Sequence, residues 1–299
     1  MANSLIPGTA TELESGLMME LVDWHTHCFL HDHRTDEDRA LQSQRGVLGD
    51  GEAEPELHAQ VIDEAGIDKF VVIALPKFGG NHTPSEFIAE TVARYPGRAV
   101  GLCSVHPHDA DAPEAFEHAL SLGLKGLKIS PTYQEMDPRS AACRPLYEIA
   151  CQHDVPVMFH CGGAYTGSLE FADPTLLDKV AMEHPKLKII VAHFGQPYME
   201  QTAIVMRKNP NVFADLSARY HRPWQLYNGL MIAQEYRVAD RLLFGSDFPV
   251  RTPRKAIDEF RALNDWGEGL AMPRIPDKLI ESILYERPLS MLGIEPDPA

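Results

Sequence analysis

The chain has 299 residues, of which 44% are hydrophobic, and it carries a formal net charge of −16. This composition is typical of a globular protein with a large core, and α/β barrels of this size form one domain. The negative charge argues against nucleic acid and anionic membranes as partners, because both require clustered basic residues.

The sequence also gives expectations about compartment and assembly. No stretch approaches the roughly 18 consecutive apolar residues of a membrane span, and the first residues lack the basic start and apolar core of a signal peptide. The five cysteines are scattered without a Cys-x-x-Cys pair, which favours a reducing compartment. We therefore expect a cytoplasmic protein that acts on a small molecule, with a homodimer as the commonest form of assembly.

A short apolar run, a polar turn and a helical stretch recur along the chain. Near-continuous apolar runs of this length are typical of parallel strands buried on both faces. The predicted strands are 19–25, 69–76, 98–105, 124–130, 155–160, 187–193, 211–217 and 240–247. The predicted helices between them are 55–67, 83–96, 113–123, 144–154, 174–185 and 201–210.

Eight strands alternating with helices predict a (β/α)₈ TIM barrel that spans residues 1–299 as a single domain. A doubly wound open sheet is the alternative, and the lack of Gly-x-Gly-x-x-Gly after the first strand disfavours it. Residues 30–54 are polar and weakly periodic. They predict a long loop after the first strand, and such loops often serve as lids.

Functional residues of such barrels lie at the carboxyl ends of the strands, and histidine stands at four of the eight predicted strand ends. His25 and His27 are two residues apart, so their side chains share one face of an extended strand. With His160 and Asp247 from two other strands, they form a set suited to zinc or a similar ion. A single histidine is more often a core residue bonded to the backbone, but this interpretation fits the whole set less well.

Four motifs that end predicted strands, DWHTH, FHCG, AHFG and LLFGSDFP, resemble those of the amidohydrolase superfamily. GLKGLKISPTYQEMD, PLYEIACQHDVPVMFHCG and ILYERPLSMLGI are similar to its branch of aminocarboxymuconate-semialdehyde decarboxylase types and lactone hydrolases. The resemblance implies one divalent ion, zinc ahead of manganese or another metal, held by His25, His27, His160 and Asp247. It also implies that His193 is a polarising or acid–base group and that Asp247 moves the proton of the attacking water.

Two further His-x-His pairs compete with the first one. The pair 31/33 lies among acidic residues, and we interpret it as part of a solvated loop. The pair 106/108 follows a predicted strand, but Pro107 ends that strand. His106 is a candidate substrate contact, with a core or surface position as the alternative.

Basic residues near the strand ends indicate the charge of a substrate. Lys128, Arg219 and Arg222 stand out in an acidic protein and predict an anionic substrate, although Arg222 also fits an exposed surface. Two-metal members of the superfamily carry a carboxylated lysine at the position of Lys128, but a salt bridge or anion contact is favoured here. Tyr165, in the turn CGGAYTGS, is placed to stack on a substrate ring or to form a hydrogen bond.

Three functions are compatible with these residues. The favoured one is hydrolysis of a lactone, ester or amide by a metal-activated water. The alternative is non-oxidative decarboxylation of an aromatic or unsaturated acid. Related decarboxylases usually show His-Pro where this chain has His160-Cys161, which favours hydrolysis. A non-catalytic barrel that binds a metal or ligand is the remote third option.

Overall fold

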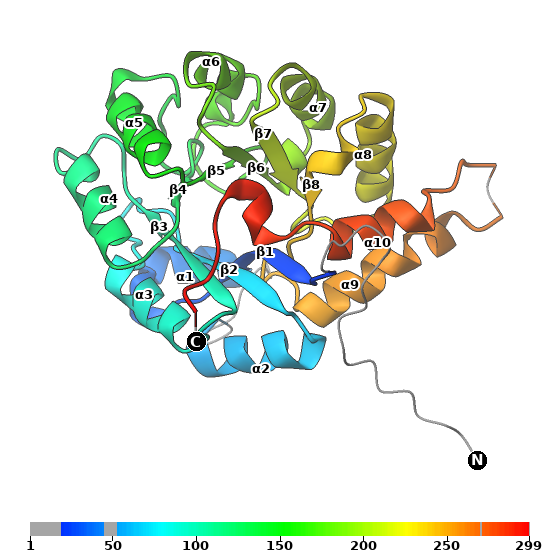
Figure 1. The fold of residues 1–299 in the computed structure, drawn as a ribbon, viewed down its shortest axis with the longest axis horizontal. Helices are drawn as coiled ribbons and strands as arrows, with labels where there is room; N and C mark the ends of the chain where they lie inside the picture. The colour runs from blue at the N-terminus through cyan, green and yellow to red at the C-terminus, as the bar shows by residue number, and fades with distance from the viewer. Residues whose placement is uncertain (1–18, 45–52, 270, 299) are drawn as a thin grey trace.

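The computed structural model describes residues 19–44, 53–269 and 271–298. Its strands form one parallel sheet in the order of the sequence, from β1 to β8. They occupy the centre of the fold, and the helices surround them (Figure 1). The strands are β1 (Val22–His27), β2 (Lys69–Ile73), β3 (Ala99–Ser104), β4 (Leu127–Ile129), β5 (Val157–His160), β6 (Ile189–Ala192), β7 (Val212–Asp215) and β8 (Leu242–Leu243).

The six predicted helices are confirmed to within a few residues as α2 to α7, and further helices precede and follow them. The helices are α1 (Asp36–Gln44), α2 (Pro55–Ala65), α3 (Ser85–Ala93), α4 (Ala112–Ser121), α5 (Arg144–Gln152), α6 (Leu176–Glu183), α7 (Met199–Lys208), α8 (Pro223–Glu235), α9 (Pro253–Arg261) and α10 (Asp277–Tyr285). Among the described residues, no helix is both long and apolar enough to cross a membrane.

The first and last strands meet and complete the barrel. Trp24 N donates to Phe244 O at 2.9 Å, and His27 N donates to Phe248 O at 2.9 Å. The segment that continues β8 therefore runs beside β1, and the predicted (β/α)₈ barrel is confirmed. This pairing places Asp247 next to β1, because Asp247 N donates to His25 O at 2.7 Å.

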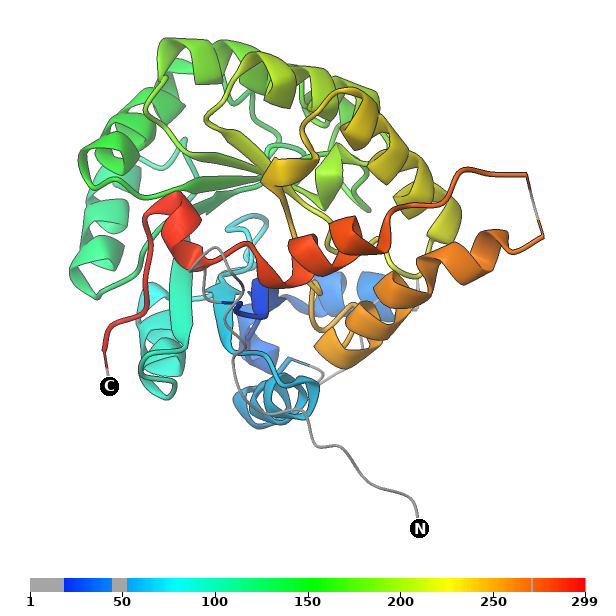
Figure 2. The same cartoon turned by 45° about the vertical axis from the view of Figure 1, so that its right-hand side comes forward.

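The barrel interior is an apolar core that the C-terminal segment closes at one end. Interior side chains from six strands pack together with three residues of this segment, which crosses the barrel in both views (Figure 2). Trp24 Nε1 also donates to Arg287 O at 2.8 Å, so Arg287 belongs to this closed end. The cluster consists of Val22, Trp24, Val71, Ile73, Val100, Leu102, Met158, Ile190, Ala192, Leu243, Leu289, Leu292 and Ile294.

An irregularity in β1 lets two adjacent side chains face inward. Trp24 packs in the interior cluster, whereas His25 reaches the cavity at the other end of the barrel. Regular alternation forbids this arrangement, and the register between β1 and β2 shifts between Asp23 and Thr26. Gly245 leaves the space that His25 needs, since a Cβ there would lie 2.7 Å from His25 Cβ.

The prediction of a long loop over residues 30–54 is wrong in part. Residues 31–33 form a 3₁₀ helix, η1 (His31–His33), and residues 36–44 form α1. Neither helix has a buried residue, so the sequence shows no apolar stripe that would reveal them. Residues 45–52 of the predicted loop lie outside the described residues.

Candidate metal and active site

A cavity of about 440 Å³ opens at the carboxyl ends of the strands. All the predicted site residues line it except His106. His106 lies outside this lining, and its Nδ1 accepts a hydrogen bond from His108 N at 3.2 Å. The predicted residues that the structure brings together here are His25, His27, Lys128, His160, Tyr165, His193, Arg219, Arg222 and Asp247.

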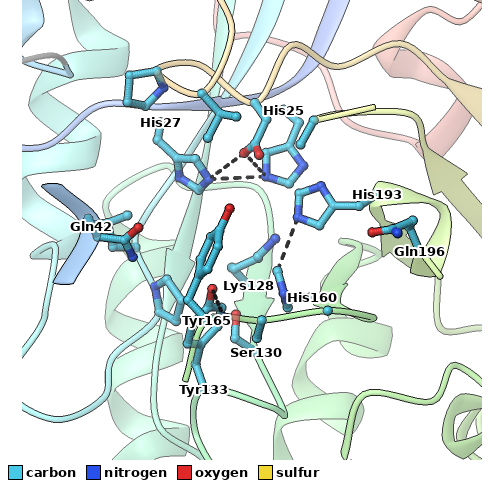
Figure 3. Close-up of a pocket in the computed structure, with 18 of the residues that line it drawn as sticks. His25, His27, Gln42, Lys128, Ser130, Tyr133, His160, Tyr165, His193 and Gln196 are labelled. Carbon is cyan, nitrogen blue, oxygen red and sulfur yellow. Dashed lines mark hydrogen bonds and ion pairs between the residues drawn. The ribbon is translucent and has the colours of Figure 1, made fainter. Parts of the chain in front are cut away.

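Three predicted ligand atoms form a nearly equilateral triangle at the end of β1 (Figure 3). His25 Nε2 lies 3.3 Å from His27 Nε2 and 3.4 Å from Asp247 Oδ1. The third side, between His27 Nε2 and Asp247 Oδ1, measures 3.5 Å. In a tetrahedral zinc site with ligand bonds of about 2.0–2.1 Å, donor atoms lie about 3.3–3.4 Å apart. The spacing of the triangle therefore fits a metal ion.

Hydrogen bonds fix the two histidines in the tautomer that metal binding requires. His27 Nδ1 lies 2.8 Å from Ile73 O, which only accepts, so Nδ1 carries the hydrogen. His25 Nδ1 lies 2.9 Å from Asp215 Oδ2 and carries its hydrogen in the same way. In the neutral rings that a metal ion would bind, both Nε2 lone pairs then point at each other and at Asp247 Oδ1. Three lone pairs in such close contact repel one another, and a cation between them would satisfy all three.

His193 is a fourth nitrogen beside this triangle. Its ligand atom lies within 4.8 Å of those of His25 and Asp247. Its Nδ1 is 2.7 Å from Ser217 Oγ, and its Nε2 is 3.2 Å from His160 Nδ1. His193 and Asp247 both have positive φ, 58° and 61°, a backbone conformation that non-glycine residues seldom adopt. Such strain is concentrated at functional sites.

His160 lines the cavity and contacts His193. Its Nδ1 faces His193, and its buried Nε2 has no hydrogen-bond partner among the residues that the structure describes. Burial lowers the pKa of His160 to about 3, with Lys128 contributing in the same direction. His160 is therefore a neutral ring at neutral pH. The described contacts join it to His193 and not to the triangle of His25, His27 and Asp247.

Burial keeps the rings of His25 and His193 neutral and leaves one acid ionised. Desolvation lowers the pKa of His25, and it lowers the pKa of His193 well below the usual value. Burial alone would raise the pKa of Asp247, but His25, His27 and Lys128 outweigh it and hold this pKa below its usual value. The triangle thus contains the neutral ring of His25, the imidazole of His27 and one carboxylate, a donor set that binds divalent ions.

The cavity also contains cations that form no hydrogen bond with an acidic side chain among the described residues. Lys128 is 2% exposed, and burial lowers its pKa to about 8; Figure 3 shows it pointing toward the histidines. Arg219 is 9% exposed and donates only to the neutral oxygens of Ser217, Gln196 and Gln225. Neither forms a carboxylate ion pair with any described residue. Arg222, the third cation, is exposed at the cavity edge.

An aromatic wall completes the cavity. Tyr133 stacks on Phe78 with ring centroids 5.2 Å apart, and its ring lies 5.0 Å from that of His160. Tyr165 is 43% exposed, and its backbone N lies 3.5 Å from Tyr133 Oη. Tyr165, which the sequence suggests as a substrate contact, lines the cavity. Tyr133, which was not predicted, provides the flat surface beside it.

Sequence reasoning missed Asp215 and gave Ser217 no role. Both are fully buried. Asp215 contacts His25 Nδ1 at 2.9 Å, and Ser217 Oγ contacts His193 Nδ1 at 2.7 Å and His25 Nδ1 at 3.2 Å. An acidic residue inside the apolar run 211–217 was the available signal, because a buried charge requires a partner.

The segment after β1 also reaches the cavity. Arg34, Asp38 and Gln42 line it, and Arg34 Nε pairs with Asp38 Oδ2 at 2.8 Å. His31 is exposed and contacts the exposed Asp32, whereas His33 Nδ1 accepts from Leu30 N at 3.1 Å. The histidines of this second pair point to local partners and not to the triangle.

A family model described as amidohydrolase matches residues 22–294 of the chain. The match extends from the first strand to the segment that closes the barrel. No curated protein matches the chain in sequence.

Solved structures with low sequence identity share the fold. An uncharacterised TIM-barrel protein from Bordetella bronchiseptica has a TM-score of 0.71 at 20% identity, covering 92% of this chain and 99% of that one. A probable 2-pyrone-4,6-dicarboxylic acid hydrolase from Acinetobacter baumannii, with citric acid bound, has 0.68 at 16%, covering 92% and 100%. A dihydroxybenzoic acid decarboxylase from Polaromonas sp. JS666, with manganese and 2-nitroresorcinol, has 0.58 at 20%, covering 88% and 95%.

Proposed function

Because the chain belongs to the amidohydrolase family, we propose that it is a metal-dependent hydrolase of a small anionic lactone, ester or amide. The observation that supports this most is the triangle of His25 Nε2, His27 Nε2 and Asp247 Oδ1, with sides of 3.3 to 3.5 Å. A divalent ion, zinc ahead of manganese, held there supplies the Lewis acidity that activates water at neutral pH. His160 is proposed as a further metal ligand, since its buried Nε2 forms no hydrogen bond with any described residue.

Asp247 is proposed to move the proton. Its Oδ1 faces both histidines of the triangle, and its Oδ2 makes neither contact. Its lowered pKa keeps it a carboxylate at neutral pH. Asp247 is thus in the correct state to accept a proton from the attacking water and return it to the leaving group.

The ring of His193 is in a protonation state in which its Nε2 can accept a proton. Its Nδ1 is turned to Ser217 Oγ, and its Nε2 faces the cavity side occupied by His160. With its hydrogen on Nδ1, the neutral ring has no N–H to offer a substrate carbonyl. We therefore assign His193 the acid–base role and not the polarising role.

The unpaired cations support an anionic substrate. A buried charge without a counter-ion is costly, yet Lys128 and Arg219 are both buried at the cavity without a carboxylate partner in the described part of the chain. Arg34, by contrast, is neutralised by Asp38. A substrate carboxylate would form charge-assisted hydrogen bonds with Lys128 and Arg219. Tyr133 and Tyr165 would flank a planar ring.

Isotope labelling separates hydrolysis from decarboxylation. The purified protein, loaded with zinc or manganese, is incubated in ¹⁸O-water with a panel of carboxylated lactones, esters and amides and with hydroxylated aromatic acids. Hydrolysis places one ¹⁸O atom in the product carboxylate and releases no carbon dioxide. Carbon dioxide release from an aromatic acid, without ¹⁸O in the product, would establish the decarboxylase alternative instead.

A further inference from the structure

Asp215 lies at the end of β7 with its two carboxylate oxygens turned toward two different histidines. It is fully buried. Oδ2 accepts from His25 Nδ1 at 2.9 Å. Oδ1 accepts from the backbone N–H of His193 at 3.0 Å and from the backbone N–H of Ser217 at 3.0 Å. One side chain therefore holds β1, β6 and the segment after β7 together.

Ser217 extends this contact to the ring of His193. Its hydroxyl lies 2.5 Å from Asp215 Oδ1, which only accepts, so the single hydroxyl hydrogen is donated to Asp215. Ser217 Oγ must then accept from His193 Nδ1, which lies 2.7 Å away. The hydrogen of His193 is thereby held on Nδ1, and its Nε2 is left with a lone pair.

We propose that Asp215 is the positioning residue that fixes the tautomers of both His25 and His193, directly for the first and through Ser217 for the second. The proposal rests on the functions proposed above for these two histidines. Each ring presents an Nε2 lone pair to the cavity because its Nδ1 hydrogen is donated to Asp215 in His25 and to Ser217 in His193. The carboxylate of Asp215 then determines the tautomer of the proposed metal ligand, His25, and that of the proposed acid–base group, His193.

The direct contact of Asp215 with His25 and its indirect contact with His193 through Ser217, here called the two branches, respond differently to substitution. In Asp215→Asn, the amide oxygen can keep the two backbone N–H bonds on the Oδ1 side, which places the amide N–H₂ opposite His25 Nδ1. That donor forces His25 to move its hydrogen to Nε2 and removes the lone pair. In Ser217→Ala, the bond between Asp215 Oδ2 and His25 Nδ1 stays. The variant removes the contacts of Ser217 Oγ with His193 Nδ1 at 2.7 Å and with His25 Nδ1 at 3.2 Å, and it leaves the backbone carbonyl of Ser217 at 3.3 Å from His193 Nδ1.

Asp23→Asn is the matched control. Asp23 is also a fully buried acid, two residues before His25. Its Oδ1 accepts from His25 N at 3.1 Å and from Ser246 N at 2.9 Å, and its Oδ2 forms no hydrogen bond within the described part of the chain. An asparagine can keep both backbone bonds, and no histidine ring nitrogen is touched.

The test measures zinc affinity by competition with a chromophoric chelator and histidine tautomers by ¹⁵N NMR of the metal-free protein. We expect Asp215→Asn to weaken zinc binding about 10- to 100-fold and to move the His25 hydrogen to Nε2. We expect Ser217→Ala to keep zinc affinity, because Asp215 still holds His25. The His193 Nδ1 hydrogen is then held only by the longer contact to the backbone carbonyl of Ser217, at 3.3 Å, so a fraction of the His193 rings should carry the hydrogen on Nε2 and the apparent pKa of His193 in the pH–rate profile should shift. Asp23→Asn should match the wild type in both measurements.

The proposal is overturned if metal-free wild-type protein carries the His25 or His193 hydrogen on Nε2. It is also overturned if Asp215→Asn and Ser217→Ala leave both tautomers unchanged. If Asp215→Asn fails to fold, the tautomer of His193 in Ser217→Ala decides the second branch. A wild-type protein that binds no zinc but keeps both Nδ1 hydrogens would refute the proposed metal chemistry and leave the role of Asp215 standing.

Discussion

Two His-x-His pairs lie within nine residues of each other, and the structure gives them different surroundings. His25 and His27 end a buried strand, and their Nδ1 atoms are held by Asp215 and by Ile73 O. His31 and His33 form a short helix without buried residues and contact only neighbours in sequence through their ring nitrogens. A His-x-His spacing thus becomes a candidate metal site only where distant strands supply partners behind the rings.

The same contrast applies to the acids beside each pair. Asp247 is buried and reaches its histidines from the far end of the chain, whereas the side chain of Asp32 is 96% exposed. Water screens the second acid from its neighbours and leaves it little influence. The following predictions test this contrast, from the largest expected effect to the smallest.

Asp247→Asn should lower kcat by about 10³-fold or more while much of the bound metal is retained, because the amide cannot accept the water proton. Steady-state kinetics with elemental analysis of the purified variant measure both effects. Asp32→Asn is the control and should match the wild type. A kcat of Asp247→Asn close to the wild-type value would remove this residue from proton transfer.

His27→Gln should weaken zinc binding by about 100-fold, because the triangle loses one of its three donors. Chelator competition measures the affinity, and His33→Gln should bind zinc like the wild type. Equal losses in the two variants would show that the second pair belongs to the site and that burial does not distinguish them.

Lys128→Met should raise KM for an anionic substrate about 10-fold or more, because a hydrogen bond to a charged group contributes about 1.5–3 kcal/mol. The ammonium group is charged below its pKa of about 8 and neutral above it. In the wild type, KM should therefore rise as the pH passes through about 8, and in Lys128→Met this rise should vanish.

Lys77→Met is the matched control for this pH dependence. Lys77 is paired with Asp109 at 2.7 Å and does not line the cavity. Its variant should keep the wild-type KM at every pH. A pH-independent KM in the wild type would show that Lys128 does not contact the substrate.

His31→Ala should change the free energy of unfolding by less than about 0.5 kcal/mol, as is usual for an exposed side chain. Urea denaturation followed by circular dichroism measures this value. A loss of several kcal/mol would mean that the second pair supports the fold in a way its exposed contacts do not indicate.

The barrel and the triangle were predictable because their signals are local. Apolar runs reveal each strand, and the carboxyl ends of parallel strands meet at one end of a barrel. The spacing of His25 and His27, with Asp247 at the end of the last strand, was therefore enough to predict that the three converge. His106 also follows a strand but does not line the cavity, so a strand end alone does not fix where a side chain points.

The remaining parts of the site depend on contacts that no local pattern encodes. Asp215 acquires its role only because β7 places it behind His25, which is 190 positions away in the chain. α1 has no buried residues, so its sequence lacks the apolar periodicity that predicts a helix. His160 was predicted from its strand end, but which nitrogen faces which partner depends on the packing of β5 against β6.

Metal titration of the metal-free protein tests the central claim most directly. Zinc or manganese is added in steps to protein stripped with a chelator, and bound ion and turnover of an identified substrate are measured on the same samples. We predict that turnover rises in proportion to bound metal and levels off at one ion per chain. Full turnover with no ion bound, or saturation without any gain in turnover, would contradict a metal-dependent hydrolase built on His25, His27 and Asp247.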